Sequence, residues 1–498
     1  MEPTQNVETV PAIPIPVEPT IDQPRGSTGI TLRQYIILVG FGAFITTFAQ
    51  QQVLGALPLK HLLRTDFHLS KQNISFFIFW ATFAWNIKPI AGIFTDAFPL
   101  FNTRRRHYMI IGTGFAGLLW VVLGFCDSNY SWLLIISVLM NVSTVFASTV
   151  MGGLMVEAGQ AFNSPGRIAS LRQGAQSIAS ICGPPLGGFL AERTFGWKAT
   201  TGIAGGAAIS LAFITYKFLR EKPIRKEDVV HDPTLKRHDY RLPIGIIFPL
   251  IIIGAGGTWL LFAGPDFRQV GISIFAVLAT FLSIIGIVFM PSTNPVIIKA
   301  QGQLVEILRS RTLFMAVIML FLVYTVPGMN TPLYVQQTEV LKISLGRVGW
   351  FGSLEGIFGV IGAAGYAFYC KKINLRNLLL GAIGLNAALT FLYLIYNAGS
   401  APYIHSIGGF VGVLSELALM DLAVRSTPRG CEALGFALMM SVRNFGIGAS
   451  DIIGSKMMED LHVSFNQLVT INACTTFAVL LFIPFLPKLV MMRKEGER

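Results

Sequence analysis

Several charged side chains stand inside long apolar runs, where a charge is costly unless it has a partner or a function. Arg172 and Arg443 each interrupt such a run, and Glu157, Glu355 and Glu416 do so with carboxylates. An arginine at this depth can neutralise an anionic solute, and a carboxylate can carry a proton. We therefore predict that Arg172 and Arg443 bind a negatively charged solute and that Glu157 and Glu416 are candidates for proton coupling. The alternative, that the charges pair between helices and only hold the bundle, stays open.

Polar neighbours extend this predicted binding set. Gln176 follows Arg172 by one helical turn, and Asn444 stands next to Arg443. Three consecutive glutamines at 50–52 form a polar ring in the first apolar run, and we expect at least one to face the solute. The predicted substrate-binding residues are Arg172, Gln176, Arg443, Asn444, Gln51 and Glu355.

A carboxylate and a cluster of basic residues share a short loop between two apolar runs. Carboxylate and guanidinium groups at helix ends can pair across the two halves of a transporter and separate as the halves rock. We predict a cytoplasmic gate built from this loop and the helix before it: Lys88, Gly92, Asp96, Arg104, Arg105 and Arg106. The alternative is a basic anchor on the cytoplasmic side with no gating role.

The runs that hold these residues are long enough to cross a bilayer. Of 498 residues, 53% are apolar and 13% charged, and runs of about twenty apolar residues match a hydrocarbon layer of roughly 30 Å. The net charge of +12 sits mostly in loops between the runs, which is the orientation signal of a membrane protein and argues against nucleic-acid binding. The sequence predicts an all-α membrane protein with about 14 transmembrane helices.

Two sets of six spans surround an inserted pair. We expect spans at about 34–59, 74–96, 107–126, 131–157, 168–192 and 198–218, an inserted pair at 243–263 and 270–290, and further spans at 312–336, 346–370, 377–396, 401–424, 432–456 and 466–490. The inserted pair returns the chain to its starting side, so both halves keep one orientation. Such paired halves place a solute site near the bilayer midplane, between them.

The domain boundaries follow from these spans and from the charges between them. We expect a disordered cytoplasmic tail (1–30), an N-terminal six-helix bundle (31–218), a cytoplasmic loop (219–242), an inserted transmembrane hairpin (243–290), a cytoplasmic connector (291–311), a C-terminal six-helix bundle (312–490) and a basic cytoplasmic tail (491–498). Ile297, Leu304 and Leu308 are expected to line one side of a surface helix in the connector. The protein is predicted to lie in the plasma (inner) membrane, with both termini on the cytoplasmic side.

Motifs of catalysis are absent from the sequence. It contains no P-loop lysine pattern, no nucleophile elbow and no HExxH, and its five cysteines are scattered without a metal-binding spacing. We predict that the chain is not an enzyme and that it needs no cofactor or metal.

Two stretches resemble the folate-biopterin transporter family of the major facilitator superfamily. They are IKPIAGIFTDAFPLFNTRRRHY, after the second span, and ELALMDLAVRSTPRGCEALGFALMMSVRNFG, through the tenth and eleventh. The resemblance implies two six-helix bundles, folates or pterins as solutes, and coupling to protons. In one departure from the family, Ser148 and Gly152 occupy a region where it often has an aspartate, ahead of Val156 and Glu157. In another, the inserted hairpin is not part of the usual twelve-span plan.

We predict a secondary active transporter that moves a small organic anion, a folate or pterin by analogy, by alternating access with proton coupling. An exporter or exchanger of another metabolite or drug stays open, because GPPLGG (residues 183–188) resembles the end of the superfamily's antiporter motif. A receptor or scaffold that does not transport is the third possibility. The expected partners are the solute, the lipid bilayer and protons.

Overall fold

The computed structural model describes residues 32–97, 99–103, 105–161, 165–221, 295–370, 372–428 and 431–492. The predicted hairpin (243–290), the N-terminal tail, nearly all of the loop 219–242 and the last six residues lie outside the described residues. Within the described ranges the elements are helices, with one isolated bridge between Leu100 and Thr103. This agrees with the predicted all-α fold.

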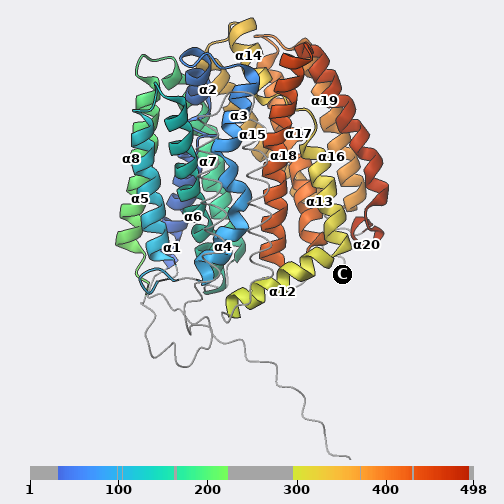
Figure 1. Ribbon diagram of the computed structural model, residues 1–498. Helices are drawn as coiled ribbons and strands as arrows, with labels where there is room; N and C mark the ends of the chain where they lie inside the picture. The colour runs from blue at the N-terminus through green and yellow to red at the C-terminus, as the bar shows by residue number, and fades with distance from the viewer. Residues whose placement is uncertain are drawn as a thin grey trace, which may run out of the picture.

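The N-terminal half forms the blue-to-green side of Figure 1. Its elements are α1 (Leu32–Phe48), α2 (Ala56–Thr65), α3 (Lys71–Ala81), the 3₁₀ turn η1 (Phe83–Ile87), α4 (Lys88–Ala97), α5 (Arg106–Leu123), α6 (Tyr130–Ala161), α7 (Pro165–Ala191) and α8 (Gly196–Phe218).

The C-terminal half forms the yellow-to-red side. Its elements are α12 (Pro295–Arg309), α13 (Arg311–Tyr324), α14 (Asn330–Val335), the π-helical turn η3 (Gln336–Val340), α15 (Leu345–Tyr369), α16 (Leu375–Thr390), η4 (Phe391–Ile395), α17 (Ala401–Ser426), α18 (Glu432–Asp460), α19 (Phe465–Val479), η5 (Leu480–Phe485) and α20 (Lys488–Met491). Helix α12 lies across one end of the molecule, and α14 lies at the opposite end (Figure 1). We call these the α12 end and the α14 end.

Polar caps fix where several helices begin. Side chains of Ser70, Ser310, Ser344, Asn374 and Ser464 each accept a hydrogen bond from a backbone amide in the first turn of α3, α13, α15, α16 and α19. Such caps satisfy amides that have no partner within the helix. The helix starts therefore follow from single polar residues at the edges of apolar runs.

Seven of the described helices are long and apolar enough to cross a membrane, and α12 with α13 forms a pair bent by 75°. Helices α7 and α18 have 27 and 29 residues and are long enough to span a membrane, but they are too polar to be counted among these seven. These two polar helices join the halves: α7 packs against α15, and α18 packs against α3. Polarity thus marks the helices that face the middle of the molecule.

The GPPLGG stretch of α7 is a close contact between helices. A Cβ atom at Gly187 would come within 2.3 Å of the Leu54 carbonyl oxygen, and one at Gly188 within 2.3 Å of the Leu345 carbonyl oxygen. Gly349 of α15 faces the Pro184 carbonyl oxygen in the same way, at 2.4 Å. Glycine lets the two backbones approach here.

Helix α12 buries one side, as expected for the connector, but Leu308 is not among its buried residues. Ile297 and Leu304 are buried together with Ile307, whereas Leu308 is 69% exposed. The chain bends sharply into α13 immediately afterwards, so the last turn of α12 presents Ile307 to the core instead.

Candidate functional site

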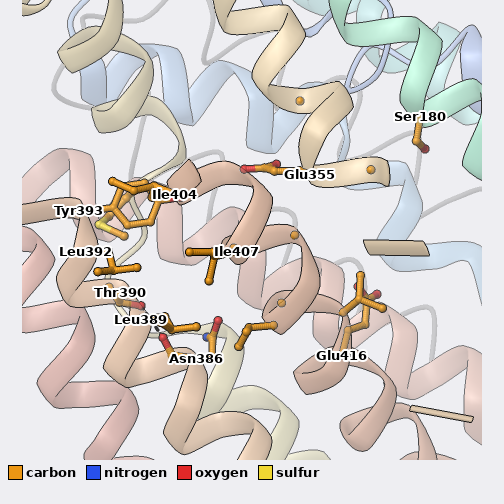
Figure 2. Close-up of a pocket in the computed structure, with 18 of the residues that line it drawn as sticks. Ser180, Glu355, Asn386, Leu389, Thr390, Leu392, Tyr393, Ile404, Ile407 and Glu416 are labelled. Carbon is orange, nitrogen blue, oxygen red and sulfur yellow. Dashed lines mark hydrogen bonds between the residues drawn. The ribbon is translucent and has the colours of Figure 1, made fainter. Parts of the chain in front are cut away.

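A cavity of about 640 Å³ lies against the C-terminal half and reaches the N-terminal half. Its wall includes Gln52 and Ser180 from the N-terminal half and Glu355, Tyr393 and Glu416 from the C-terminal half. Figure 2 shows Glu355 between Ser180 and Tyr393 in this view, with Glu416 on another part of the wall. Polar and apolar groups contribute about equally to its wall, which also includes Asn386, Thr390 and Asn472. A cavity of this size is typical of small-molecule sites.

Glu355 connects this cavity to a buried polar network. Its Oε1 lies 2.5 Å from Nδ1 of His405 on α17, and Nε2 of His405 lies 2.8 Å from the Tyr396 hydroxyl. Gln337 Nε2 donates to the same hydroxyl at 2.5 Å. Glu355 was predicted from the sequence, whereas His405, Tyr396 and Gln337 were not. An imidazole four residues into the apolar run of α17 was the signal that could have identified His405.

The predicted solute arginine Arg443 is paired with the predicted proton carrier Glu416. Nη2 of Arg443 on α18 donates to Oε1 of Glu416 on α17 at 2.6 Å, and its guanidinium lies 5.3 Å from the centre of the Tyr324 ring. Nη1 reaches Oδ1 of Asn444 at 3.4 Å. The pair is neutral overall, as expected if the two charges only hold the helices together. Glu416 nevertheless also lines the cavity.

Two cations lie close together in the N-terminal half. Nζ of Lys88 on α4 donates to the Ser148 hydroxyl of α6 at 3.0 Å and lies 5.3 Å from the centre of the Trp85 ring. Arg172 of α7 is its charged neighbour. Among the described residues, no carboxylate pairs with either cation. Gly152, one turn along α6 from Ser148, has open space beside it, since a Cβ there would meet no atom within 4 Å.

The glutamines of the first span have different environments. Gln51 is buried, donates to the Ser137 hydroxyl at 2.8 Å and accepts from Asn141 at 2.9 Å. Gln52 instead lines the cavity. The structure therefore places Gln52, rather than Gln51, on the cavity wall. Gln176 is half-buried on α7.

The predicted gate lies partly outside the described residues. Arg104 and the side chain of Asp96 are not described, nor is the side chain of Glu157, the other predicted proton-coupling candidate. The backbone amides of Arg105 and Arg106 both donate to Glu221 Oε2 at 3.0 Å, and the Arg106 guanidinium stacks over the Tyr216 ring at 5.3 Å. These contacts stay within the N-terminal half.

A second set of contacts, not predicted from the sequence, joins the two halves at the α14 end. Arg64 of α2 forms a bidentate ion pair with Glu339 of η3. Its Nε donates to Oε1, and its Nη2 donates to Oε2 at 2.8 Å. Glu459 of α18 accepts from the Lys71 amide at the start of α3 at 2.7 Å, and Glu192 accepts from the Gly346 amide at 2.8 Å. The buried Lys60 donates to the Asn330 side chain at 2.9 Å. The halves are thus bound together by polar contacts at this end.

Replacing Glu339 by glutamine is expected to weaken closure at the α14 end. Hydrogen bonds from Arg64 hold the pKa of Glu339 below its usual value of 4.5. The ion pair therefore stabilises the closed end fully above that value, and the stabilisation is lost as the pH falls through the lowered pKa. Because both side chains are about one-third exposed, we expect a loss of about 0.5–1 kcal/mol, a two- to five-fold change in population.

Distances between spin labels at positions 66 and 461, in a background without the native cysteines, measure this change. Wild type should open at this end on acidification, and Glu339→Gln should be more open at neutral pH and insensitive to acid. Asp460→Asn is the matched control, since Asp460 pairs with Lys456 within α18 at 3.8 Å. Equal opening in Glu339→Gln and the control would contradict the assignment.

The sequence profile of the BT1 family matches residues 51–497, nearly the whole chain. The chain belongs to the BT1 family. This BT1-family chain is 23% identical over 523 aligned residues to probable folate-biopterin transporter 4 of Arabidopsis thaliana, covering 94% of this chain and 98% of that protein. It is 23% identical over 463 residues to the folate-biopterin transporter of Synechocystis sp., covering 89% and 80%.

The fold of the BT1-family chain also matches solved transporters. A POT family transporter in complex with 5-aminolevulinic acid superposes with a TM-score of 0.65 at 12% identity, covering 91% of this chain and 96% of that one. The chain is therefore an integral, multi-pass membrane transporter with a major facilitator fold. The predicted family resemblance is confirmed, as is the prediction that the chain is not an enzyme.

Proposed function

We propose that this transporter moves a folate- or pterin-like organic anion by alternating access, coupled to protons. The observation that carries the proposal is a contrast in charge between the two halves of the molecule. Lys88 and Arg172 of the N-terminal half have no carboxylate partner among the described residues, whereas Glu355 of the C-terminal half is a carboxylate on the cavity wall. A solute with an anionic group and a set of N–H donors complements both sides.

The chemistry of folates matches this arrangement. A pteridine ring presents neighbouring N–H donors, which a carboxylate can accept as a pair, and a glutamate tail presents carboxylates that lysine and arginine bind strongly. Glu355 would accept from the ring, while Arg172 and Lys88 would bind the tail. Gln176, Asn444 and the Arg443–Glu416 pair complete the proposed site, with Gln52 on the cavity wall.

Alternating access requires that the two ends close in turn. The α14 end is held by the Arg64–Glu339 ion pair. We propose that the predicted gate residues Asp96, Arg104, Arg105 and Arg106 close the α12 end in the opposite state. We further propose that the α12 end faces the cytoplasm, as the basic residues of that loop favour.

Counterflow in proteoliposomes tests the proposal. Vesicles containing the purified chain are loaded with unlabelled folic acid, and entry of radiolabelled folic acid is followed. We expect entry that is competed by folic acid and more weakly by biopterin, because biopterin has no carboxylates. Entry of neither compound would overturn the proposal, and entry of biopterin that folic acid does not inhibit would overturn the role of the two cations.

A further inference from the structure

We infer that His405 and Glu355 together bind the transported proton, and that Tyr396 and Gln337 hold the imidazole in place. The inference rests on the proposed proton-coupled transport and names the site of the coupling. It differs from the sequence-based prediction, which assigned proton coupling to Glu157 or Glu416.

The geometry gives this pair one buried side and one side open to the cavity. His405, Tyr396 and Gln337 are 5%, 7% and 3% exposed. Glu355 lines the cavity, and its side chain is 45% exposed. The Phe351 ring stacks on the imidazole, with ring centres 5.1 Å apart. A proton can therefore reach the pair from the cavity through Glu355, while the imidazole stays fixed.

Few other charges act on the pair. The titratable groups facing it from η4 are the phenols of Tyr393 and Tyr396, whereas η3 contributes the neutral Gln337. Helix α7 presents Ser180 and Pro184 to the cavity, with Arg172 two turns away along the helix. On α17 and α15, the described charged residues nearest in sequence are Glu416 and Arg347, eleven residues from His405 and eight from Glu355. Along these two helices, the nearest described charged residues thus lie two or more helical turns from the pair.

The hydrogen bonds accommodate two states that differ by one proton. Without it, neutral His405 donates from Nδ1 to the Glu355 carboxylate, and Nε2 accepts from the Tyr396 hydroxyl. With it, the imidazolium donates from Nδ1 to Glu355 and from Nε2 to the Tyr396 oxygen. Gln337 donates to that oxygen in both states. A hydroxyl can act as donor or acceptor, so only the Tyr396 hydroxyl hydrogen has to rotate when the proton arrives.

The proton changes the charge that the cavity presents to a solute. The pair carries one negative charge without the proton and none with it. An anion therefore binds better to the protonated form, and by linkage the proton binds better when the anion is present. Favourable coupling between the binding of a proton and the binding of an anion is the requirement for symport.

His405→Asn separates coupling from solute binding, because asparagine can still donate to Glu355 but cannot take up a proton. His405 is not among the residues proposed to touch the solute. We expect His405→Asn to keep folic acid counterflow and to lose accumulation driven by a pH gradient. Tyr396→Phe keeps the imidazole and removes one of its hydrogen bonds, so it should keep accumulation but shift its pH dependence. His462→Asn, at an exposed histidine beyond α18, is the matched control.

An infrared pH titration of the solute-free protein provides a readout that does not depend on the substrate. Wild type and His462→Asn should show a titrating imidazole band and a coupled carboxylate band, both missing from His405→Asn. An unchanged titration in His405→Asn, or normal pH-driven accumulation by that variant, would overturn the inference. Loss of counterflow in a correctly folded His405→Asn would also overturn it. Absence of counterflow in wild type would instead overturn the proposed substrate, while the infrared titration would still decide the proton site.

Discussion

Replacing Ser148 by aspartate is expected to abolish most transport of folic acid. The Ser148 hydroxyl already accepts a hydrogen bond from Lys88 at 3.0 Å, so a carboxylate at this position would form an ion pair with the lysine. Lys88 would then no longer be available to the anionic end of a solute. A hydrogen bond to a charged group contributes about 1.5–3 kcal/mol, so we expect kcat/KM for folic acid to fall by about 10- to 100-fold.

Ser148→Asn is the control, because asparagine has nearly the same shape as aspartate and no charge. It should retain most folic acid transport, and biopterin transport should be similar in wild type and both variants. Initial rates of uptake into proteoliposomes over a range of solute concentrations measure this difference. Equal losses for folic acid and biopterin in Ser148→Asp would show that Lys88 does not bind the anionic group.

The positions of many described helices were predictable, because long apolar runs leave few alternatives to helices. The spans expected at 131–157 and 401–424 correspond to α6 (130–161) and α17 (401–426). The breaks inside spans were not predicted. The first span is interrupted between Phe48 and Ala56, and the seventh between Tyr324 and Asn330. The mean hydropathy of a window of residues changes little when a few turn residues interrupt an apolar run.

The charged candidates for the site were easier to identify in the sequence than their partners. A charge in an apolar run is visible in the sequence, so Arg172, Arg443, Glu355 and Glu416 were all named. Which charge meets which depends on how helices distant in sequence pack. Arg443 and Glu416 are 27 residues apart and lie on different helices. Pattern alone could not show that two of the candidates cancel each other's charge.

The contacts at the α14 end were missed for a different reason. Arg64 and Glu339 are 275 residues apart and lie outside the predicted spans, where charges are common. Nothing in the composition distinguishes them from solvated surface residues. The predicted gate was placed at the other end because its carboxylate and arginines are adjacent in sequence. An ion pair between distant segments becomes visible only when both halves are placed in space.

Replacing Glu416 by glutamine is expected to destabilise the protein and impair transport, because it leaves the half-buried Arg443 without its countercharge. Removing one partner of a buried pair costs about 3–5 kcal/mol, and since Glu416 is 42% exposed to the cavity we expect about 2 kcal/mol. The double variant Glu416→Gln with Arg443→Met removes both charges and should recover most of this stability, as measured by thermal unfolding in detergent.

Transport then decides between the two roles of the arginine. If the double variant is stable and still transports folic acid, Arg443 only holds α17 and α18 together. If it is stable and inactive, Arg443 binds the solute and exchanges Glu416 for it. Asp460→Asn, which removes a pair with Lys456 within α18, controls for the loss of an ion pair that does not join two helices.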